Sequence, residues 1–365
     1  GITVFETKTG TEDVAAAILG NKLVLSSAPD GVESAIDTFK DSKSLARKEG
    51  AKKLLAGKSA VKKPIFKLYV QSPELLEQLA ALESVVMGIG FQEEGLRLQV
   101  LTSFNPDALK HDFKPGKSKI VSRFPAETFA LVSGREMNKI WSEIVEQSAA
   151  LPELEQALNY SRDSFELINL DLDEDIFCWM NGEFALSLIG VNEGIFREFG
   201  IGTSAIFQTS DWETANRTLA KLEDLAVQNP DVAIDRRTVQ DKTIVQWKTP
   251  LGEVLLSYGW LDNNSLAMAW GSHEADILKV RPKTSLAQSQ NFKAMTGSLP
   301  QKNFGYFYFD MAKATAAFKY YNELPPETRE ILDSIRGIGA TTILKDSSTR
   351  ELDLLLHLQP LQGAQ

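Results

Sequence analysis

The chain has 365 residues, of which 43 % are hydrophobic and 24 % are charged. This composition is ordinary for a globular protein and excludes collagen-like, coiled-coil and disordered chains. The formal net charge of −10 argues against general nucleic-acid binding. The single cysteine, Cys178, excludes an intrachain disulfide, and three histidines supply little material for metal binding or acid–base catalysis.

The first hundred residues predict strands, helices and a closing hairpin. Three short alternating strands begin at Ile2–Phe5, and two helices follow them. The β-branched and aromatic stretch Pro64–Val70 predicts the next strand, and a helix is expected over Glu74–Leu82. Glu83–Thr102 then alternates like a hairpin, with its turn at Glu93-Glu94-Gly95.

A stretch with Pro106 and Lys114-Pro115-Gly116 follows, which predicts a linker over residues 107–124. The part of the chain after it alternates between strand and helix patterns. The predicted elements are a strand at Thr128–Val132, helices within Glu136–Leu170, a short helix at Asp173–Met180, strands at Glu183–Ile189 and Ile201–Gln208, and a helix at Trp212–Val227.

Residues 1–106 align with residues 241–360, which indicates an internal repeat. Gly1–Thr9 matches Asp241–Thr249, and Asn21–Leu25 matches Asn264–Met268. Three more matches follow in the same order: Ser44-Leu45-Ala46 with Ser285-Leu286-Ala287, Lys63–Tyr69 with Lys302–Tyr308, and Gly88-Ile89-Gly90 with Gly337-Ile338-Gly339. Because the order and the offset are nearly constant, chance is a poor explanation.

Residues 125–240 have no counterpart upstream. We therefore predict three parts: residues 1–106 as the second half of a first repeat, residues 107–124 as a linker, and residues 125–365 as a complete second repeat. On this interpretation the first unit lacks its front half, and the parent gene should encode such a segment before Gly1. The predicted fold class is α+β, with mainly antiparallel sheets covered by helices on one side.

Several short motifs match known binding sites in residue type, but the residues and elements around them do not fit those sites. Gly57-Lys58-Ser59 and Gly116-Lys117-Ser118 lack the earlier glycine of a phosphate-binding loop. Gly200–Ala205 leads into a strand, whereas a dinucleotide site needs its glycines to open a helix. The alternating acids of Asn169–Asp175 lack the later ligands of a calcium loop, so helix capping is the better interpretation. We predict no cofactor and no metal, and we expect Cys178 to be a buried thiol.

The sharpest feature is a basic segment, residues 43–67, with nine lysines and arginines against one acid, Glu49. Its counterpart in the second repeat, residues 284–306, has only Lys293 and Lys302. Because the second repeat is built without this charge, the segment is either a solvated helix face or a docking surface for anionic lipid headgroups or an acidic protein partner. The expected contact residues are Lys48, Lys52, Lys53, Lys62 and Lys63.

Four residues around the short helix form a motif. Asp175, Trp179, Gly182 and Glu183 resemble the D-x-x-x-W-x-x-G-E pattern of domain-of-unknown-function family 3352, common in cyanobacteria. The segment Phe124–Gly134 is also similar to that family. Within the motif, Cys178 stands where the family often has Pro, and Asn181 stands where a Gly is common. The resemblance implies a bacterial protein with an N-terminal membrane anchor and carries over no catalytic residue.

The leading hypothesis is a non-enzymatic, membrane-associated binding or scaffold protein, anchored in its full-length form. Its soluble part would lie outside the cytoplasm, in the periplasm or thylakoid lumen. The second hypothesis is a carrier of an apolar ligand, lipid or pigment-like, held between sheet and helices near the aromatic strand Tyr306–Phe309. The third is a hydrolase, which would need a convergent polar cluster that no motif supplies.

Overall fold

The computed structural model describes residues 2–9, 12–27, 29–41, 47, 61, 63–71, 82–106, 112–149, 151–192, 194–239, 241–271, 282–318 and 320–359. Contacts within the chain divide it into two compact units, residues 1–59 and residues 60–365. Each unit has a sheet of its own. Of the predicted helix over Glu74–Leu82, residues 74–81 lie outside the described residues, and Leu82 belongs to a strand instead. Four of the five predicted contact lysines also lie outside the described residues.

The smaller unit is a three-stranded meander packed on one helix. Its strands pair in the order β1-β2-β3, all antiparallel. The elements are β1 (Val4–Thr9), β2 (Glu12–Leu19), β3 (Lys22–Ser26) and α1 (Pro29–Asp41). Its core is formed by Ala15, Ala17 and Leu19 of β2 against Val32 and Ile36 of α1. The helix forms because Val32 and Ile36 lie four residues apart, on one face.

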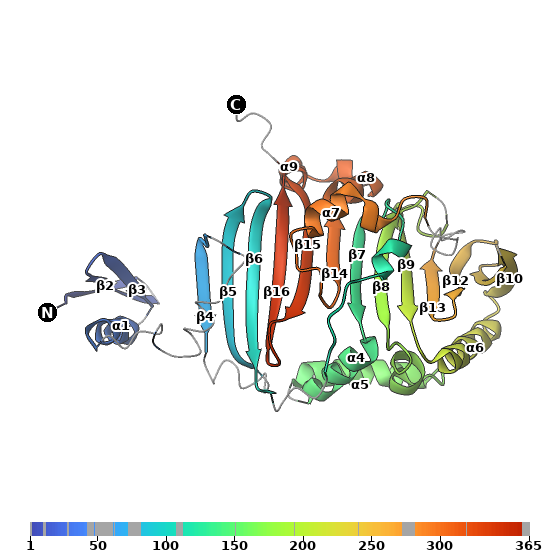
Figure 1. The fold of residues 1–365 in the computed structure, drawn as a ribbon, viewed down its shortest axis with the longest axis horizontal. Helices are drawn as coiled ribbons and strands as arrows, with labels where there is room; N and C mark the ends of the chain where they lie inside the picture. The colour runs from blue at the N-terminus through green and yellow to red at the C-terminus, as the bar shows by residue number, and fades with distance from the viewer. Residues whose placement is uncertain are drawn as a thin grey trace. The chain divides into compact units, whose positions relative to one another are not determined.

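The larger unit is built on a 13-stranded sheet in which every neighbouring pair is antiparallel. The strand order is β10-β11-β12-β13-β9-β8-β7-β14-β15-β16-β6-β5-β4, with β4 and β10 as the outer strands (Figure 1). The bounds are β4 (Phe66–Val70), β5 (Leu82–Gln92), β6 (Gly95–Phe104), β7 (Ala130–Arg135), β8 (Glu183–Gly190), β9 (Ile201–Gln208), β10 (Ala233–Val239), β11 (Lys242–Lys248), β12 (Val254–Asp262), β13 (Ser265–Trp270), β14 (Tyr306–Asp310), β15 (Ile335–Leu344) and β16 (Thr349–Leu358).

Helices lie near both ends of these strands. In Figure 1, α4, α5 and α6 run along the lower ends, and α8 and α9 lie at the upper ends. The bounds are η3 (Ile120–Arg123), α4 (Met137–Ser148), α5 (Pro152–Glu166), η4 (Leu172–Phe177, a π-helix), α6 (Trp212–Gln228), η5 (Leu286–Gln288), α7 (Gln290–Thr296), α8 (Met311–Ala317), η6 (Tyr321–Glu323) and α9 (Pro326–Ser334).

The sheet has a hydrophobic core on each of its two faces. On the first face, Tyr306 and Tyr308 of β14 pack with Phe292 and Met295 of α7. On the second face, Leu219 of α6 and the residues around Trp179 pack on β9, β12 and β13. The α+β class and the antiparallel pairing are as predicted, but the expectation that helices cover one side is wrong. The reason is that strands such as β9 and β13 carry apolar residues on both faces, and each of these faces packs into its own core.

The predicted linker, residues 107–124, is described from residue 112 onward, and this described part is packed against the larger unit. In the described part of this stretch, Phe113, Ile120 and Val121 are buried. The division after residue 59 follows from contacts within the chain and does not test the repeat. The repeat boundaries therefore stay a prediction.

Candidate binding face and polar pocket

Apolar side chains form one continuous row across eight neighbouring strands of the large sheet. Each member of the row is directly opposite the next in the strand register. From β8 to β4 the row consists of Leu186, Val132, Phe307, Ala340, Leu354, Leu98, Ile89 and Phe66. Because strands lie about 4.8 Å apart, seven intervals give a row of about 34 Å.

Two further rows flank this one on the same face, because residues two apart along a strand point the same way. One consists of Leu188, Ala130, Phe309, Ile338, Leu356, Leu96 and Phe91. The other consists of Leu352, Val100, Met87 and Leu68. We call the three rows together the apolar face, and none of its members is charged.

Much of the apolar face is open to solvent. Val132, Phe307 and Leu352 are 47 %, 40 % and 36 % exposed, and Phe66 of β4 is 48 % exposed. The middle row continues past Leu186 into Ala205 of β9, which belongs to the second-face core under α6. The same side of the sheet is therefore covered from β9 to β12, whereas the rows from β8 to β4 are partly open, with Ala340 buried in the middle row.

The opposite side of β6 and β16 carries buried polar residues. On β6, Arg97 and Gln99 are buried, and on β16 so are Glu351 and Asp353. Arg97 donates to Asp353, and Gln99 Nε2 donates to Glu351 Oε1 at 3.3 Å. A sheet with one covered face usually turns its apolar residues inward. In β16, Glu351 and Asp353 point to the covered side and Leu352, Leu354 and Leu356 to the other, which makes the apolar face a candidate binding surface.

A small hollow of about 200 Å³ lies beside the Leu352 row. Thr342, which pairs with Leu352, and Arg350 line it, together with Glu143 and Ile140 of α4. Arg350 donates to Glu143 at 3.3 Å, and its guanidinium lies 5.4 Å from the ring centre of Phe113. Polar and charged groups therefore stand at one border of the apolar face.

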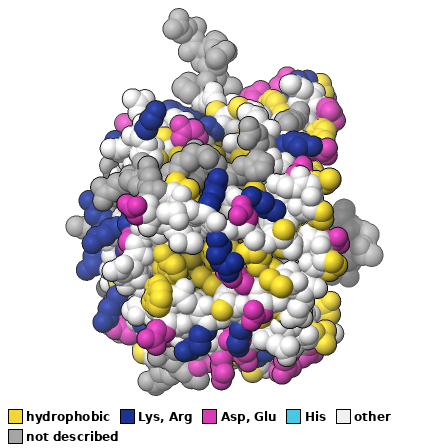
Figure 2. Space-filling view, turned by 90° about the vertical axis from the view of Figure 1, so that its right-hand side faces the viewer, with side chains coloured by type: hydrophobic (Ala, Val, Ile, Leu, Met, Phe, Trp, Pro, Cys, Tyr) yellow, Lys and Arg dark blue, Asp and Glu magenta, His cyan; other side chains and the backbone are white. Residues whose placement is uncertain are grey.

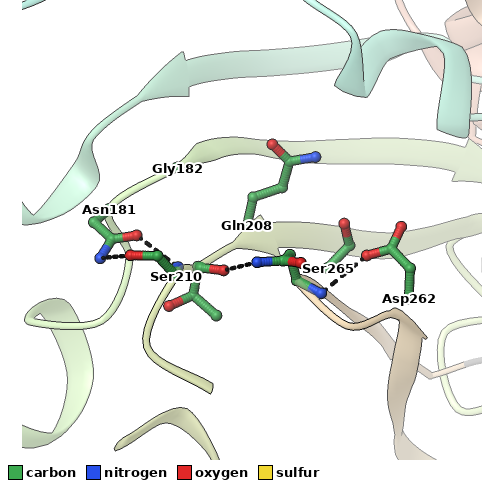
Figure 3. A pocket seen from close by; sticks show the side chains of 8 residues that line it. Asn181, Gly182, Gln208, Ser210, Asp262 and Ser265 are labelled. Carbon is green, nitrogen blue, oxygen red and sulfur yellow. Dashed lines mark hydrogen bonds between the residues drawn. The ribbon is translucent and has the colours of Figure 1, made fainter. Parts of the chain in front are cut away.

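A second, open pocket is polar and lies where β8 and β13 begin and β9 and β12 end (Figure 3). Its side chains largely bond to one another or to the backbone: Asn181 Nδ2 donates to Ser210 Oγ at 2.9 Å, and Asn264 Nδ2 donates to the Thr209 carbonyl at 3.0 Å. Figure 3 shows the amide of Gln208 pointing into the pocket with no dashed bond to the residues drawn.

Among the described residues that line this polar pocket, Asp262 is the only carboxylate. Burial by itself would raise the pKa of Asp262, but hydrogen bonds from Ser265 and Asn264 and the charge of Arg123 hold it below its usual value. The carboxylate pairs with Arg123 at 2.6 Å. A carboxylate that is ionised and paired has little capacity for general acid–base work, so this pocket offers hydrogen bonds rather than proton transfer.

The four-residue motif around the π-helix η4 is structural. The indole of Trp179 is buried and donates to the Asp175 carbonyl at 2.9 Å, while Lys221 pairs with the Asp175 carboxylate at 2.7 Å. Gly182 does not have a positive φ, so its backbone angles do not require a glycine. A Cβ at this position would lie 2.8 Å from the Gln208 carbonyl oxygen, so close approach of β9 requires the glycine.

Glu183, the last member of the motif, is buried and accepts hydrogen bonds from the amides of Lys119 and Ile120, each at 2.9 Å. It also pairs with Arg135. The motif therefore joins the segment before β7 to the start of β8.

The acids predicted to cap the short helix do so. Asp171 is its N-cap and accepts from the amides of Asp173 and Glu174, both at 2.7 Å. Asp173 pairs with Arg162. Over the described ranges, no group of three or more His, Cys, Asp or Glu side chains is placed to hold a metal ion. Cys178, expected to be buried, is exposed, because the π-helix directs Trp179 inward and the thiol outward.

Of the predicted basic contact residues, Lys63 is described and is exposed. Lys48, Lys52, Lys53 and Lys62 lie outside the described residues. Figure 2 views the larger unit from the side of β10, where basic and acidic side chains are interspersed around a patch of hydrophobic ones. On this side no charge of one sign dominates.

The apolar face was missed by sequence reasoning, which expected a ligand between sheet and helices near Tyr306–Phe309. The structure fills that space: Tyr306 and Tyr308 pack on Phe292 in the first-face core. Phe307 points the other way, onto the apolar face. The usable signal was the alternation of β16, in which leucines at 352, 354, 356 and 358 alternate with Glu351 and Asp353.

The family model described as "Protein of unknown function (DUF3352)" matches residues 1–358. The chain belongs to this family. No curated protein matches the DUF3352 chain. Among solved structures, the one described as "Structure of crystal form III of TP0453" is similar at 10 % identity and a TM-score of 0.31, over 69 % of this chain and 83 % of that chain. A likeness this weak carries no argument. In the described part of this DUF3352 member, no helix is both long enough and apolar enough to cross a membrane.

Proposed function

We propose that this DUF3352 member is a non-enzymatic, membrane-associated lipid-binding protein that holds acyl chains against the apolar face of its large sheet. The three uncharged rows support this proposal most directly. A soluble protein rarely leaves a contiguous apolar surface open unless something binds there. A row of about 34 Å also exceeds the length of an ordinary acyl chain, which the rows could hold lengthwise.

The border of the face supports an amphipathic ligand rather than a pure hydrocarbon. Arg350, Glu143 and Thr342 lie beside the Leu352 row, around the small hollow. A polar headgroup can take its hydrogen bonds from these side chains while the acyl chain lies over Leu352 and Phe307. The protein then acts as a carrier or holder of lipid, either at a membrane surface or between membranes outside the cytoplasm.

A fluorescent long-chain fatty acid provides the test. The double variant Leu352→Gln/Phe307→Gln places two amides on the open face, and it should bind the probe at least tenfold more weakly, since each buried large side chain contributes about 1.5–3 kcal/mol. Leu251→Gln is the matched control, because Leu251 is an exposed leucine in the turn between β11 and β12. Folded variants with unchanged affinity would rule out the apolar face as the binding site.

The basic segment, residues 43–67, motivates a second function, docking on anionic lipid headgroups. Its net charge of +8 has no counterpart in residues 284–306. Each Lys or Arg near an anionic bilayer contributes about 1 kcal/mol, which salt screens. Reversing Lys48, Lys52, Lys53, Lys62 and Lys63 should abolish binding to vesicles containing phosphatidylglycerol at low salt. Binding that survives reversal would remove this function and leave the fatty-acid measurement unaffected.

A further inference from the structure

β4 is an outer strand of the large sheet, and in the described part of the chain no strand pairs with its outer edge (Figure 1). Its inner edge pairs with β5 over Phe66–Val70. An outer strand presents a row of backbone N–H and C=O groups to which a further strand can add. Ile65, Phe66 and Leu68 are 66 %, 48 % and 39 % exposed. This edge therefore offers both backbone hydrogen bonds and apolar contacts.

β10, the other outer strand of the sheet, carries charged side chains along its edge. Asp235 and Arg236 are exposed. Asp235 pairs with Lys248, and Arg236 pairs with Glu223 of α6. Charged side chains on an outer strand are one of the means by which proteins prevent sheet edges from pairing. β4 has a single charged residue, Lys67, so its edge has little of this protection.

The sequence of β4 is complementary to itself when two copies of the strand run antiparallel. With a two-fold axis at Leu68, perpendicular to the sheet, Leu68 lies opposite Leu68 of the second copy. Phe66 then faces Val70 of the second copy, and Lys67 faces Tyr69. Apolar pairs of this kind stabilise neighbouring strands, and an ammonium group beside an aromatic ring is attractive. An axis at Lys67 would instead place two lysines opposite each other. The register centred on Leu68 therefore pairs all five residues of β4 without opposing like charges.

We propose that the chain forms a homodimer in which the two β4 strands pair antiparallel about Leu68 and join the two large sheets edge to edge. Such an interface is isologous, because both copies contribute the same strand. The middle row of the apolar face, which ends at Phe66, then continues into Val70 of the second copy. Five residues a side make a small interface, so the dimer exchanges with the monomer. This inference concerns the larger unit and does not depend on the lipid-binding proposal.

Sedimentation equilibrium of the 365-residue chain measures the association. The mass should rise with concentration from 40.4 kDa toward about twice that value. Leu68→Lys places two ammonium groups opposite each other at the axis, so the dimer should dissociate at least tenfold more readily. Thr238→Lys is the matched control, because Thr238 is exposed on β10, and it should leave the equilibrium unchanged. A parent chain that stays monomeric up to about 1 mM would overturn the proposal, as would a Leu68→Lys protein that dimerises like the parent.

Disulfide cross-linking tests the register separately and does not require a charged substitution. In a Cys178→Ser background, Leu68→Cys should form a covalent dimer when copper phenanthroline is added as the oxidant. Directly opposite residues have Cα atoms about 4.5–5.5 Å apart, which a disulfide spans. Phe66→Cys is the matched control, since position 66 is also exposed but lies about 13 Å, or four residues, from its own counterpart. It should cross-link at least tenfold more slowly. Equal rates at the two positions, or no covalent dimer at position 68, would overturn the proposed pairing.

Discussion

Arg97 of β6 and Asp353 of β16 form a buried ion pair where residues 60–106 join the rest of the large sheet. Arg97 Nε lies 2.7 Å from one carboxylate oxygen and Nη2 lies 2.5 Å from the other, and the two side chains are 7 % and 1 % exposed. The hydrogen bond with Asp353 is the largest cause that raises the pKa of Arg97 above its usual value. The guanidinium also donates to the Ser298 carbonyl at 3.2 Å, which ties the segment after α7 to this pair.

Removing one partner of this pair should cost more than removing both. Arg97→Met leaves Asp353 buried and uncompensated, so the free energy of unfolding should fall by about 3–5 kcal/mol. The double variant Arg97→Met/Asp353→Leu should stay within about 1 kcal/mol of the parent, because no charge is then buried alone. Urea unfolding followed by tryptophan fluorescence measures all three proteins. A double variant as unstable as the single one would contradict this account of the β6–β16 junction.

Glu183 is expected to act as a structural residue, although it belongs to the most specific motif of the sequence. Its carboxylate accepts from two amides and from Arg135, and Glu183→Gln turns one acceptor into a donor that faces donors. The substitution should lower the free energy of unfolding by about 3 kcal/mol. Glu198→Gln, at an exposed position, should change it by less than about 0.5 kcal/mol. A fully stable Glu183→Gln protein would argue that the carboxylate serves ligand binding instead.

Local patterns made most of the elements predictable. The α6 helix begins at Trp212 after the cap Asp211, whose carboxylate accepts from the Thr214 amide, and the β5–β6 hairpin turns at Glu93 and Glu94. In both cases residues a few positions apart determine the geometry.

Tertiary contacts made the remaining features unpredictable. The reason for the glycine at Gly339 lies in α7: a Cβ there would come within 2.0 Å of the Met295 carbonyl oxygen. The apolar face could not be predicted for a similar reason. The alternation of β16 divides its residues into two faces, but only the position of α7 shows that the face with Asp353 is the covered one.

His357 should make stability depend on pH. Burial, followed by the charge of Arg336, lowers its pKa below the ordinary value of 6.5, although Glu94 opposes this. The unfolded chain therefore binds a proton that the folded chain does not, and the free energy of unfolding should fall as the pH drops from about 6.5 toward the lowered pKa. Urea titrations of the parent and of His357→Gln at pH values on both sides of 6.5 isolate this effect. The stability difference between the two should shift in favour of the variant as the pH falls, and a constant difference would contradict it.

Leu352 and Leu355 lie on opposite faces of β16, and the same substitution at each separates a binding surface from a core. Leu355 is fully buried on the side of α7, so Leu355→Thr should lower the free energy of unfolding by about 2–4 kcal/mol. Leu352 is 36 % exposed on the apolar face, and Thr suits a strand, so Leu352→Thr should cost less than about 1 kcal/mol. Chemical denaturation of both variants measures the contrast. If Leu352→Thr were as damaging as Leu355→Thr, the open leucines would belong to a second core, and the apolar face would have a structural reason to exist without any lipid.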